Sequence, residues 1–459
     1  MKSNVEKQTK GSLKSTIAVS LTNYLDAGAI VAGASGLSLW KSYLGLTEVN
    51  LGWLNAISAN CLGAAIGAII GGFLADRYGR KFIYTYNMLL YMLGVFFVVF
   101  SVNFPMLLAG FLITGISVGV GVPASWTYIS ENSEVGNRGR NIGISQMAWG
   151  IGPTVILILG TLLAPPTTGA GSAGCLFGVV QAVAQALGGS GMTEAALNVF
   201  SSRIVFASLF VVALIAWLLQ RQLHESEEWE TAKETAGNAN GGTFSNFGTL
   251  FTNKVNLKAI LFLAGMYLTW NLVSSVMGFF QQHIYETAGG LSNQYANMLS
   301  VGQWFIIIAA AFFFSMVVDK VNQRWLYFMG VSFAVIAWLM VITVGINSLG
   351  GLIVFTVLWG LQGGISVQSF YALWASELFP AKYRAAAQGV MFFIVRGLSA
   401  VWGVGFTFIY GEHGEGFTVA AYVMLSLLII SLIIGTVFAP QTRGKSLEEI
   451  TKERYGSDI

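Results

Sequence analysis

The amino-acid sequence predicts an all-α membrane protein whose twelve transmembrane helices form two pseudo-symmetric six-helix bundles. Three observations support this fold class: the low charge, the spacing of apolar runs, and a repeat of charged residues in the two halves. The 459 residues are 55% hydrophobic and 10% charged, whereas a soluble globular protein carries about 25% charged residues. So few charges cannot cover a water-facing surface of this size. The 55 glycines agree, because glycine is more frequent in membrane helices than in soluble ones.

Twelve apolar runs have the length of about 20 residues that a membrane-spanning helix needs. They lie at residues 16–38, 51–73, 82–101, 104–127, 141–163, 203–222, 257–281, 297–318, 325–346, 350–374, 385–409 and 417–438. An even number of spans places both termini on one side. If that side is the cytoplasm, only Lys41, Arg203 and Arg396 fall outside cytoplasmic segments, which leaves 21 of the 24 basic residues inside. The positive-inside rule therefore predicts a multi-pass plasma-membrane protein with both termini in the cytoplasm.

The spans and the polar stretches between them predict the domain organisation. In order, we expect a cytoplasmic tail (1–15), an N-terminal bundle (16–222), a cytoplasmic linker (223–256), a C-terminal bundle (257–438) and a second tail (439–459). Residues 164–202 form a long outer loop of the first bundle. Its apolar middle, CLFGVVQAVAQAL, is too short to cross a membrane, so we expect it to lie on the surface or to plug the outer mouth.

Charged residues recur at matching places in the two halves. Asp76 follows the second span and Asp319 follows the eighth. Glu131 follows the fourth span and Glu377 follows the tenth, and each is followed by an arginine seven positions later. Internal repeats of this kind are typical of secondary transporters, which bind their solute near the midplane between the repeats.

The loop GGFLADRYGRK (71–81) resembles the signature loop of the major facilitator superfamily, and VDKVNQR (318–324) resembles its degraded second copy. Four further stretches are similar to inner-loop motifs of the sugar-porter branch, which contains sugar and polyol:proton symporters: ISENSEVGNRGR, ESEEW, ASELFPAKYRAAAQG and APQTRGKSLEEI. The resemblance covers nearly the whole chain apart from 164–202. It implies alternating access between the two bundles.

The same resemblance implies that inner-loop charges hold the cytoplasmic ends of the bundles together while the carrier faces outward. Contacts made in one state and broken in the other bias the equilibrium between the two. The alternative is that these charges only end the helices and anchor the topology. The residues of this predicted cytoplasmic gate are Asp76, Arg77, Arg80, Glu131, Arg138, Asp319, Glu377 and Arg384.

Two ionisable residues lie near the middle of spans, where such residues are costly and usually functional. Asp26 lies about ten residues into the first span and Arg396 about eleven into the eleventh, half-way through a core of about 30 Å. A carboxyl group at this depth can take up and release a proton. The resemblance likewise implies that Asp26 is the proton site, as in coupled sugar porters. Alternatively, Asp26 is held by backbone or by Asn23 in static packing, as a passive uniporter would allow.

The sequence departs from the sugar-porter pattern at three places. Phe111 stands where coupled members carry an arginine on the fourth span, Pro153 stands where a glutamine is expected, and Gln281 lies at the outer end of its span. Arg396 is similar instead to an arginine of the organic-anion branches, and guanidinium groups bind carboxylates bidentately. We therefore expect Arg396 to be either the counter-ion of Asp26 or the anchor of an anionic solute.

Amide, hydroxyl and indole side chains on spans 5, 7, 8 and 10 are predicted to bind the solute, because they lie where the resembled fold lines its cavity. Such groups suit polyhydroxyl solutes. They are Gln146, Trp149, Trp270, Asn271, Ser274, Ser275, Gln303, Gln362, Gln368, Tyr371 and Trp374.

The expected function is proton symport of a small polar solute into the cell, with a sugar or polyol as first choice. Symport of an organic anion through Arg396, facilitative uniport and a transporter-like sensor are the alternatives. We expect no enzyme, cofactor or metal, because neither a phosphate-binding loop nor metal-ligand spacing is present in the sequence. The net charge of +3 does not indicate nucleic acid. The partners expected are the solute, protons and the lipid bilayer, with a monomer as the functional unit.

Overall fold

The computed structural model describes residues 2–58, 61–166, 173–189, 191–236, 248, 250–287, 289–291, 293–346, 348–411 and 415–456. Within these ranges every regular element is a helix. Eleven helical stretches, counting Leu349–Glu377 as one, have the length and hydropathy of a membrane span. The all-α membrane fold class is therefore confirmed.

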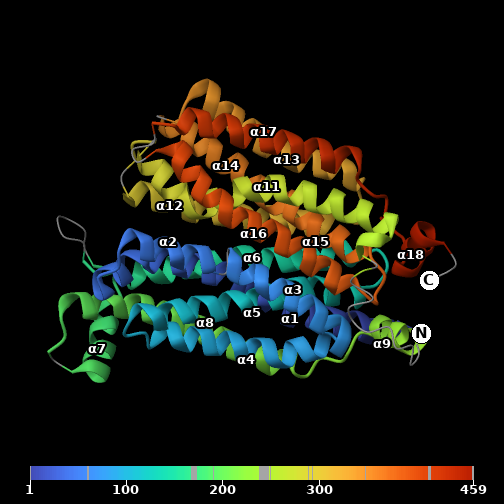
Figure 1. The fold of residues 1–459 in the computed structure, drawn as a ribbon, viewed down its shortest axis with the longest axis horizontal. Coiled ribbons are helices and arrows are strands. Elements are labelled where there is room, and N and C mark those ends of the chain that lie inside the picture. The colour runs from blue at the N-terminus through green and yellow to red at the C-terminus, as the bar shows by residue number, and fades with distance from the viewer. Residues whose placement is uncertain are drawn as a thin grey trace.

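The helices of the two halves form two bundles that lie side by side (Figure 1). The first bundle contains α1 (Lys2–Leu44), α2 (Glu48–Ile57), α3 (Leu62–Tyr78), α4 (Arg80–Val99), α5 (Phe104–Glu131), α6 (Arg138–Leu162) and α8 (Glu194–Gln220). The second contains α11 (Lys254–Thr287), α12 (Asn293–Val317), α13 (Gln323–Val344), α14 (Leu349–Ile365), α15 (Val367–Glu377), α16 (Arg384–Tyr410) and α17 (Phe417–Val437).

Two of the twelve predicted spans are each built from two helices. The second predicted span is divided between α2 and α3, which supply the crossing that the eleven long helical stretches leave out. The tenth is divided at Ser366, between α14 and α15. The side chain of Ser366 caps α15 by accepting a hydrogen bond from the backbone N–H of Val367. Hydropathy does not reveal such breaks, because a capped break is as apolar as an unbroken helix.

Several helices continue past the limits that hydropathy predicts. The predicted tail 1–15 belongs to α1 from Lys2 onward, α5 continues to Glu131, and α6 begins at Arg138. Backbone hydrogen bonding proceeds beyond the hydrocarbon layer, whereas the apolar run marks only the part inside it. The charged residues after the spans are consequently held on rigid helix ends.

The beginning of α1 and the short helix α18 (Leu447–Tyr455) lie at the same end of the molecule, which we call the terminal end (Figure 1). The linker helix α9 (Glu227–Ala236) lies there as well, and linker residues 237–247 and 249 are outside the described ranges. Helix α7 (Phe177–Gly188), from the predicted outer loop, lies at the opposite end and packs on α8. Residues 167–172 and 190 of that loop are not described.

The two bundles meet along two helix pairs, α3 with α16 and α6 with α12, which occupy equivalent places in the two halves. Glycines allow the close approach. A Cβ atom on Gly389 would lie 2.3 Å from the carbonyl oxygen of Ala68, and one on Gly143 would lie 2.6 Å from the Cβ of Ser315. Membrane helices have little hydrophobic drive to associate, so small residues that permit close van der Waals packing stabilise their contacts.

Replacing Gly389 by leucine should therefore destabilise the bundle interface. Overpacking typically costs about 1–3 kcal/mol, so we expect the Tm in detergent to fall by about 2–4 °C or more. Gly397 lies on the same helix with open space around its Cα, which makes Gly397→Leu the matched control. Equal Tm values for the two variants would contradict the proposed packing constraint.

Candidate functional site

A cavity of about 190 Å³ lies between the bundles and is lined by residues from both. The first bundle contributes residues of α1 that follow Asp26, and two residues of α6, Trp149 and Leu157. The second bundle contributes α11, α12, α14, α15 and α16. Because α1 begins at the terminal end, its lining residues place the cavity in the half of the molecule away from that end.

Eight of the eleven predicted solute-binding residues line this cavity. They are Trp149, Trp270, Asn271, Ser274, Ser275, Gln303, Gln362 and Gln368. Several of their polar groups accept or donate hydrogen bonds within the protein. The indole of Trp270 donates to Gln362 Oε1 at 2.9 Å, and Gln368 Nε2 donates to Gln146 Oε1 at 3.1 Å across the bundle interface. Gln146 therefore lies behind Gln368 and reaches the cavity through it.

Tyr371 and Trp374, although predicted to bind the solute, are not among the residues that line this cavity. Tyr371 is fully buried, with its ring stacked on that of Tyr267 at 4.1 Å. Trp374 donates to Gln323 Oε1 at 3.2 Å among aromatic rings of the second bundle. The tenth span is not one continuous helix, because α14 ends at Ile365 and α15 begins at Val367. Helical spacing counted from Gln362 therefore does not predict which residues of α15 face the cavity.

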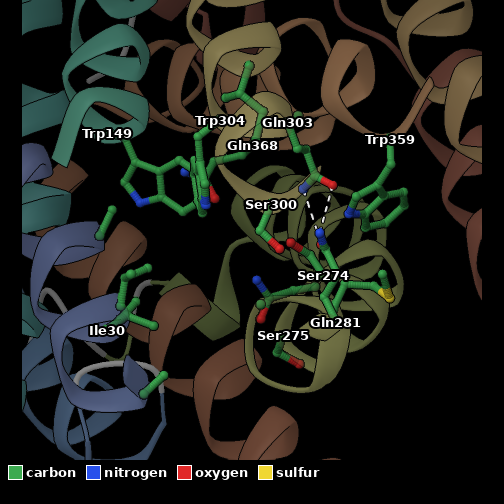
Figure 2. Close-up of a pocket in the computed structure, with 18 of the residues that line it drawn as sticks. Ile30, Trp149, Ser274, Ser275, Gln281, Ser300, Gln303, Trp304, Trp359 and Gln368 are labelled. Atoms are coloured by element: carbon green, nitrogen blue, oxygen red, sulfur yellow. Dashed lines mark hydrogen bonds between the residues drawn. The ribbon is translucent and has the colours of Figure 1, made fainter. Parts of the chain in front are cut away.

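Gln281 lines the cavity, whereas hydropathy places it at the outer end of its span. It exchanges two hydrogen bonds with Gln303, of 2.9 and 3.2 Å (Figure 2). Helix α11 continues to Thr287, so Gln281 lies well within it. Helical spacing from Asn271 through Ser274 and Gly278 leads to Gln281, and this signal could have identified it. Four further hydroxyl and indole side chains line the cavity outside the predicted set: Ser35, Ser300, Trp304 and Trp359.

Asp26 is buried at the edge of the cavity. Its Oδ2 atom accepts a hydrogen bond of 3.2 Å from the indole N–H of Trp149, and its Oδ1 atom has no hydrogen-bond partner among the described residues. Asn23 does not hold this carboxyl group, since its amide donates to Ser125 Oγ at 3.0 Å. Arg396 lines the cavity from the opposite bundle, lies over the ring of Phe392, and interacts electrostatically with Asp26.

A cluster of buried ion pairs joins the bundles at the terminal end. The side chain of Glu131 is fully buried and binds two arginines, Arg80 of its own bundle and Arg384 of the other, each at 2.8 Å. Arg384 also pairs with Glu228 of α9 at 3.1 Å. The counterpart contact in the other half joins Arg138 to Glu377 at 2.7 Å. The equal Glu–Arg spacing in the two halves thus produces equivalent contacts across the interface.

Asp76 and Asp319 each bind the first turn of a helix of the opposite bundle. Asp76 accepts hydrogen bonds from the backbone N–H groups of Ala385 and Ala386 at the start of α16. Asp319 accepts them from Gly139 and Arg140 at the start of α6. Helix N-termini favour an anion in this position. Burial raises the pKa of the Asp319 carboxyl group, while these backbone N–H groups oppose the increase.

Arg77 does not belong to this cluster, contrary to the sequence prediction. Its guanidinium group lies over the ring of Tyr78, and its side chain is exposed. Arg80, three positions later, forms ion pairs with Asp76 and Glu131. Helix α3 ends at Tyr78 and α4 begins at Arg80, with Gly79 between them at a φ of 98°, so the two arginines belong to different helices and their side chains point to different sides.

Comparisons with known proteins agree with this architecture. The family model described as Major Facilitator Superfamily matches residues 16–404. The minor myo-inositol transporter IolF of Bacillus subtilis (strain 168) is 43% identical over 448 residues, which cover 97% of this chain and 94% of that protein. The arabinose-proton symporter of the same organism is 23% identical, covering 92% of this chain and 90% of the relative.

A solved structure of the proton:xylose symporter XylE bound to 6-bromo-6-deoxy-D-glucose has the same fold, with a TM-score of 0.76 and 17% identity. The match covers 97% of this chain and 99% of that one. The family match, the similarity to transporters over nearly the full length and the shared fold lead to one assignment. This chain is a membrane transporter that belongs to the major facilitator superfamily.

Proposed function

We propose that this transporter imports a sugar or polyol, with myo-inositol as the first candidate, by proton symport. The observation that carries the proposal is the cavity, whose polar groups are mostly neutral amides and hydroxyls placed beside four indole rings. A polyol hydroxyl both donates and accepts, as does a carboxamide, and indole faces suit the C–H faces of a ring. The similarity to a myo-inositol transporter over almost the whole chain supports the same class of solute.

Asp26 is the proposed proton carrier. Its carboxyl group is buried next to the cavity, and its Oδ1 atom is available to take up a proton. Phe111 supplies no charge at the place where coupled sugar porters carry an arginine. Arg396 provides the positive charge from the other bundle instead, through its electrostatic interaction with Asp26.

Alternating access would occur by movement of the two bundles, residues 16–222 and 257–438, around the cavity between them. We propose that the terminal end faces the cytoplasm, as the distribution of basic residues favours, and that its ion-pair cluster is the cytoplasmic gate. The closed gate and the position of the cavity in the other half correspond to a carrier that receives solute from outside. The proposed functional unit is a monomer.

Symport of an organic anion is the second candidate, because Arg396 is a cavity-lining residue. A guanidinium group binds carboxylates bidentately. In this case Arg396 would bind the solute when it is present and interact with Asp26 when it is absent.

Uptake into proteoliposomes under an inward proton gradient distinguishes the two candidates. We would compare radiolabelled myo-inositol and xylose with a panel of small carboxylates. Proton-dependent accumulation of myo-inositol is expected. Accumulation of a carboxylate with none of a neutral solute would reject the polyol proposal and favour Arg396 as an anion site. Uptake that equilibrates but never accumulates would indicate facilitative uniport.

Replacing Gln362 by leucine is expected to raise the KM for myo-inositol about tenfold or more, with a smaller effect on kcat. The change removes a cavity amide and leaves the buried indole of Trp270 without its acceptor, and such losses cost about 1–3 kcal/mol. Initial rates of uptake across a range of concentrations measure both constants. Gln222→Leu, at an exposed position beyond α8, is the control, and equal KM values in both variants would remove Gln362 from the binding site.

A further inference from the structure

We propose that Trp149 is the positioning residue that transmits the protonation state of Asp26 to the opposite bundle; this inference rests on the proposed proton symport. Trp149 contacts both sides of the bundle interface. Its indole N–H binds the Asp26 carboxylate, and its ring packs against Trp304 of the second bundle. The sequence alone places Trp149 among solute-contacting groups. The geometry assigns it a second role, that of the hydrogen-bond partner of Asp26.

The first half of the connection is the bond between Trp149 Nε1 and Asp26 Oδ2, at 3.2 Å. It is the one hydrogen bond that the described residues donate to this carboxyl group. A hydrogen bond to an ionised carboxylate is markedly stronger than one to a neutral acid. When a proton adds to the carboxylate, the charge of the group goes from −1 to 0 and the bond to the indole weakens. The indole is then free to change its orientation.

The second half of the connection is the pair of indoles. The ring centroids of Trp149 and Trp304 are 5.4 Å apart with an interplanar angle of 55°. Trp149 comes from α6 and Trp304 from α12, one of the two helix pairs along which the bundles meet. Both rings line the solute cavity (Figure 2). A reorientation of Trp149 therefore changes a contact between the bundles at the place where the solute binds.

The close packing of α1 on α6 means that Trp149 responds to protonation of Asp26 by moving its side chain and not its helix. A Cβ atom on Gly152 would lie 2.3 Å from the carbonyl oxygen of Tyr24, so the two backbones are in close contact beside Asp26. The helices cannot approach further when the hydrogen bond changes. Pro153 has no N–H group, so the carbonyl of Trp149 lacks the helical bond it would normally accept. Helix α6 therefore lacks one backbone hydrogen bond at Trp149.

The other ionisable groups around Asp26 do not replace Trp149. Arg396 of α16 acts through its charge, and Tyr267 of α11 is stacked between other rings. The hydroxyl of Tyr91 in α4 donates to the carbonyl of Leu25 at 3.1 Å, not to the carboxyl group. Tyr24, on the same helix as Asp26, makes no recorded hydrogen bond to it.

Three variants separate the two halves of the connection. Trp149→Phe keeps a ring but removes the donor to Asp26. Trp304→Phe is the matched change on the other side of the pair, where no bond to Asp26 exists. Trp304→Ala removes the ring contact and preserves the bond between Trp149 and Asp26. Each is reconstituted and assayed in two ways: counterflow of radiolabelled myo-inositol at equal pH on both sides, from pH 5 to 9, and accumulation under an inward proton gradient.

In Trp149→Phe we expect the pH midpoint of counterflow, with each variant normalised to its own maximal rate, to move by about one unit toward alkaline pH, and accumulation to fall about tenfold. Trp304→Phe should retain the wild-type midpoint. Trp304→Ala should lose accumulation without a change in midpoint. If Trp149→Phe matches Trp304→Phe in both assays while Asp26→Asn abolishes accumulation, the role of Trp149 is rejected and Asp26 remains the proton site. If Asp26→Asn still accumulates solute, the proton-symport proposal itself fails.

Discussion

Asp26→Asn is expected to abolish the accumulation of myo-inositol against its gradient while solute exchange continues. Asparagine is nearly isosteric with a protonated aspartate but cannot take up or release a proton. For each proton moved with the solute, a pH difference of one unit supports a ratio of inside to outside solute concentration of about ten. In the variant this ratio should fall to one. Uptake with and without the proton gradient, together with counterflow at equal pH, measures this separation.

Glu194→Gln is a suitable control for that experiment, because Glu194 is exposed at the start of α8, away from the cavity. It should accumulate solute as the wild type does. Persistent accumulation by Asp26→Asn would make Asp26 a structural residue and require another coupling group. A wild type that only equilibrates solute, with unchanged uptake in the variant, would indicate a uniporter.

Glu131→Gln is expected to shift the carrier toward the state with an open cytoplasmic side. The buried Glu131 carboxylate binds Arg80 and Arg384 at once, and removing one partner of a buried ion pair typically costs about 3–5 kcal/mol. The open state exposes both arginines to water, so the cost falls mainly on the closed state. A difference of this size changes the population ratio by roughly two to three orders of magnitude.

The accessibility of a cavity residue from outside measures this shift. Ser274→Cys, made in a background that lacks Cys61 and Cys175, reports on the cavity wall. Its reaction with an impermeant maleimide from the outer side should slow at least about tenfold when Glu131→Gln is added. Glu134→Gln changes an exposed carboxylate near the same helix end and should have no effect. Unchanged labelling in Glu131→Gln would show that the cluster does not hold the cytoplasmic side closed.

The fold class, the spans and the matching positions of the inner charges were predictable from the sequence for a definite physical reason. A hydrocarbon layer demands about 20 apolar residues for each crossing, so the spans are visible as apolar runs. Ionic groups are excluded from that layer unless they have a role, which identifies Asp26 and Arg396 by depth alone. The repeated Glu–Arg spacing marked these residues as a candidate gate but not their partners; the structure pairs Glu131 with Arg384 and Arg138 with Glu377 across the bundle interface.

Which face of each helix meets the cavity was decided only by the tertiary structure. Lipid tails are as apolar as a packed interior, so hydropathy does not distinguish the two faces of a span. Tyr371 and Trp374 were misplaced for this reason, together with the break at Ser366, and Gln281 was missed. The bond from Trp149 to Asp26 joins residues far apart in the chain. It exists because glycines let α1 and α6 pack closely, a condition that no local sequence pattern specifies.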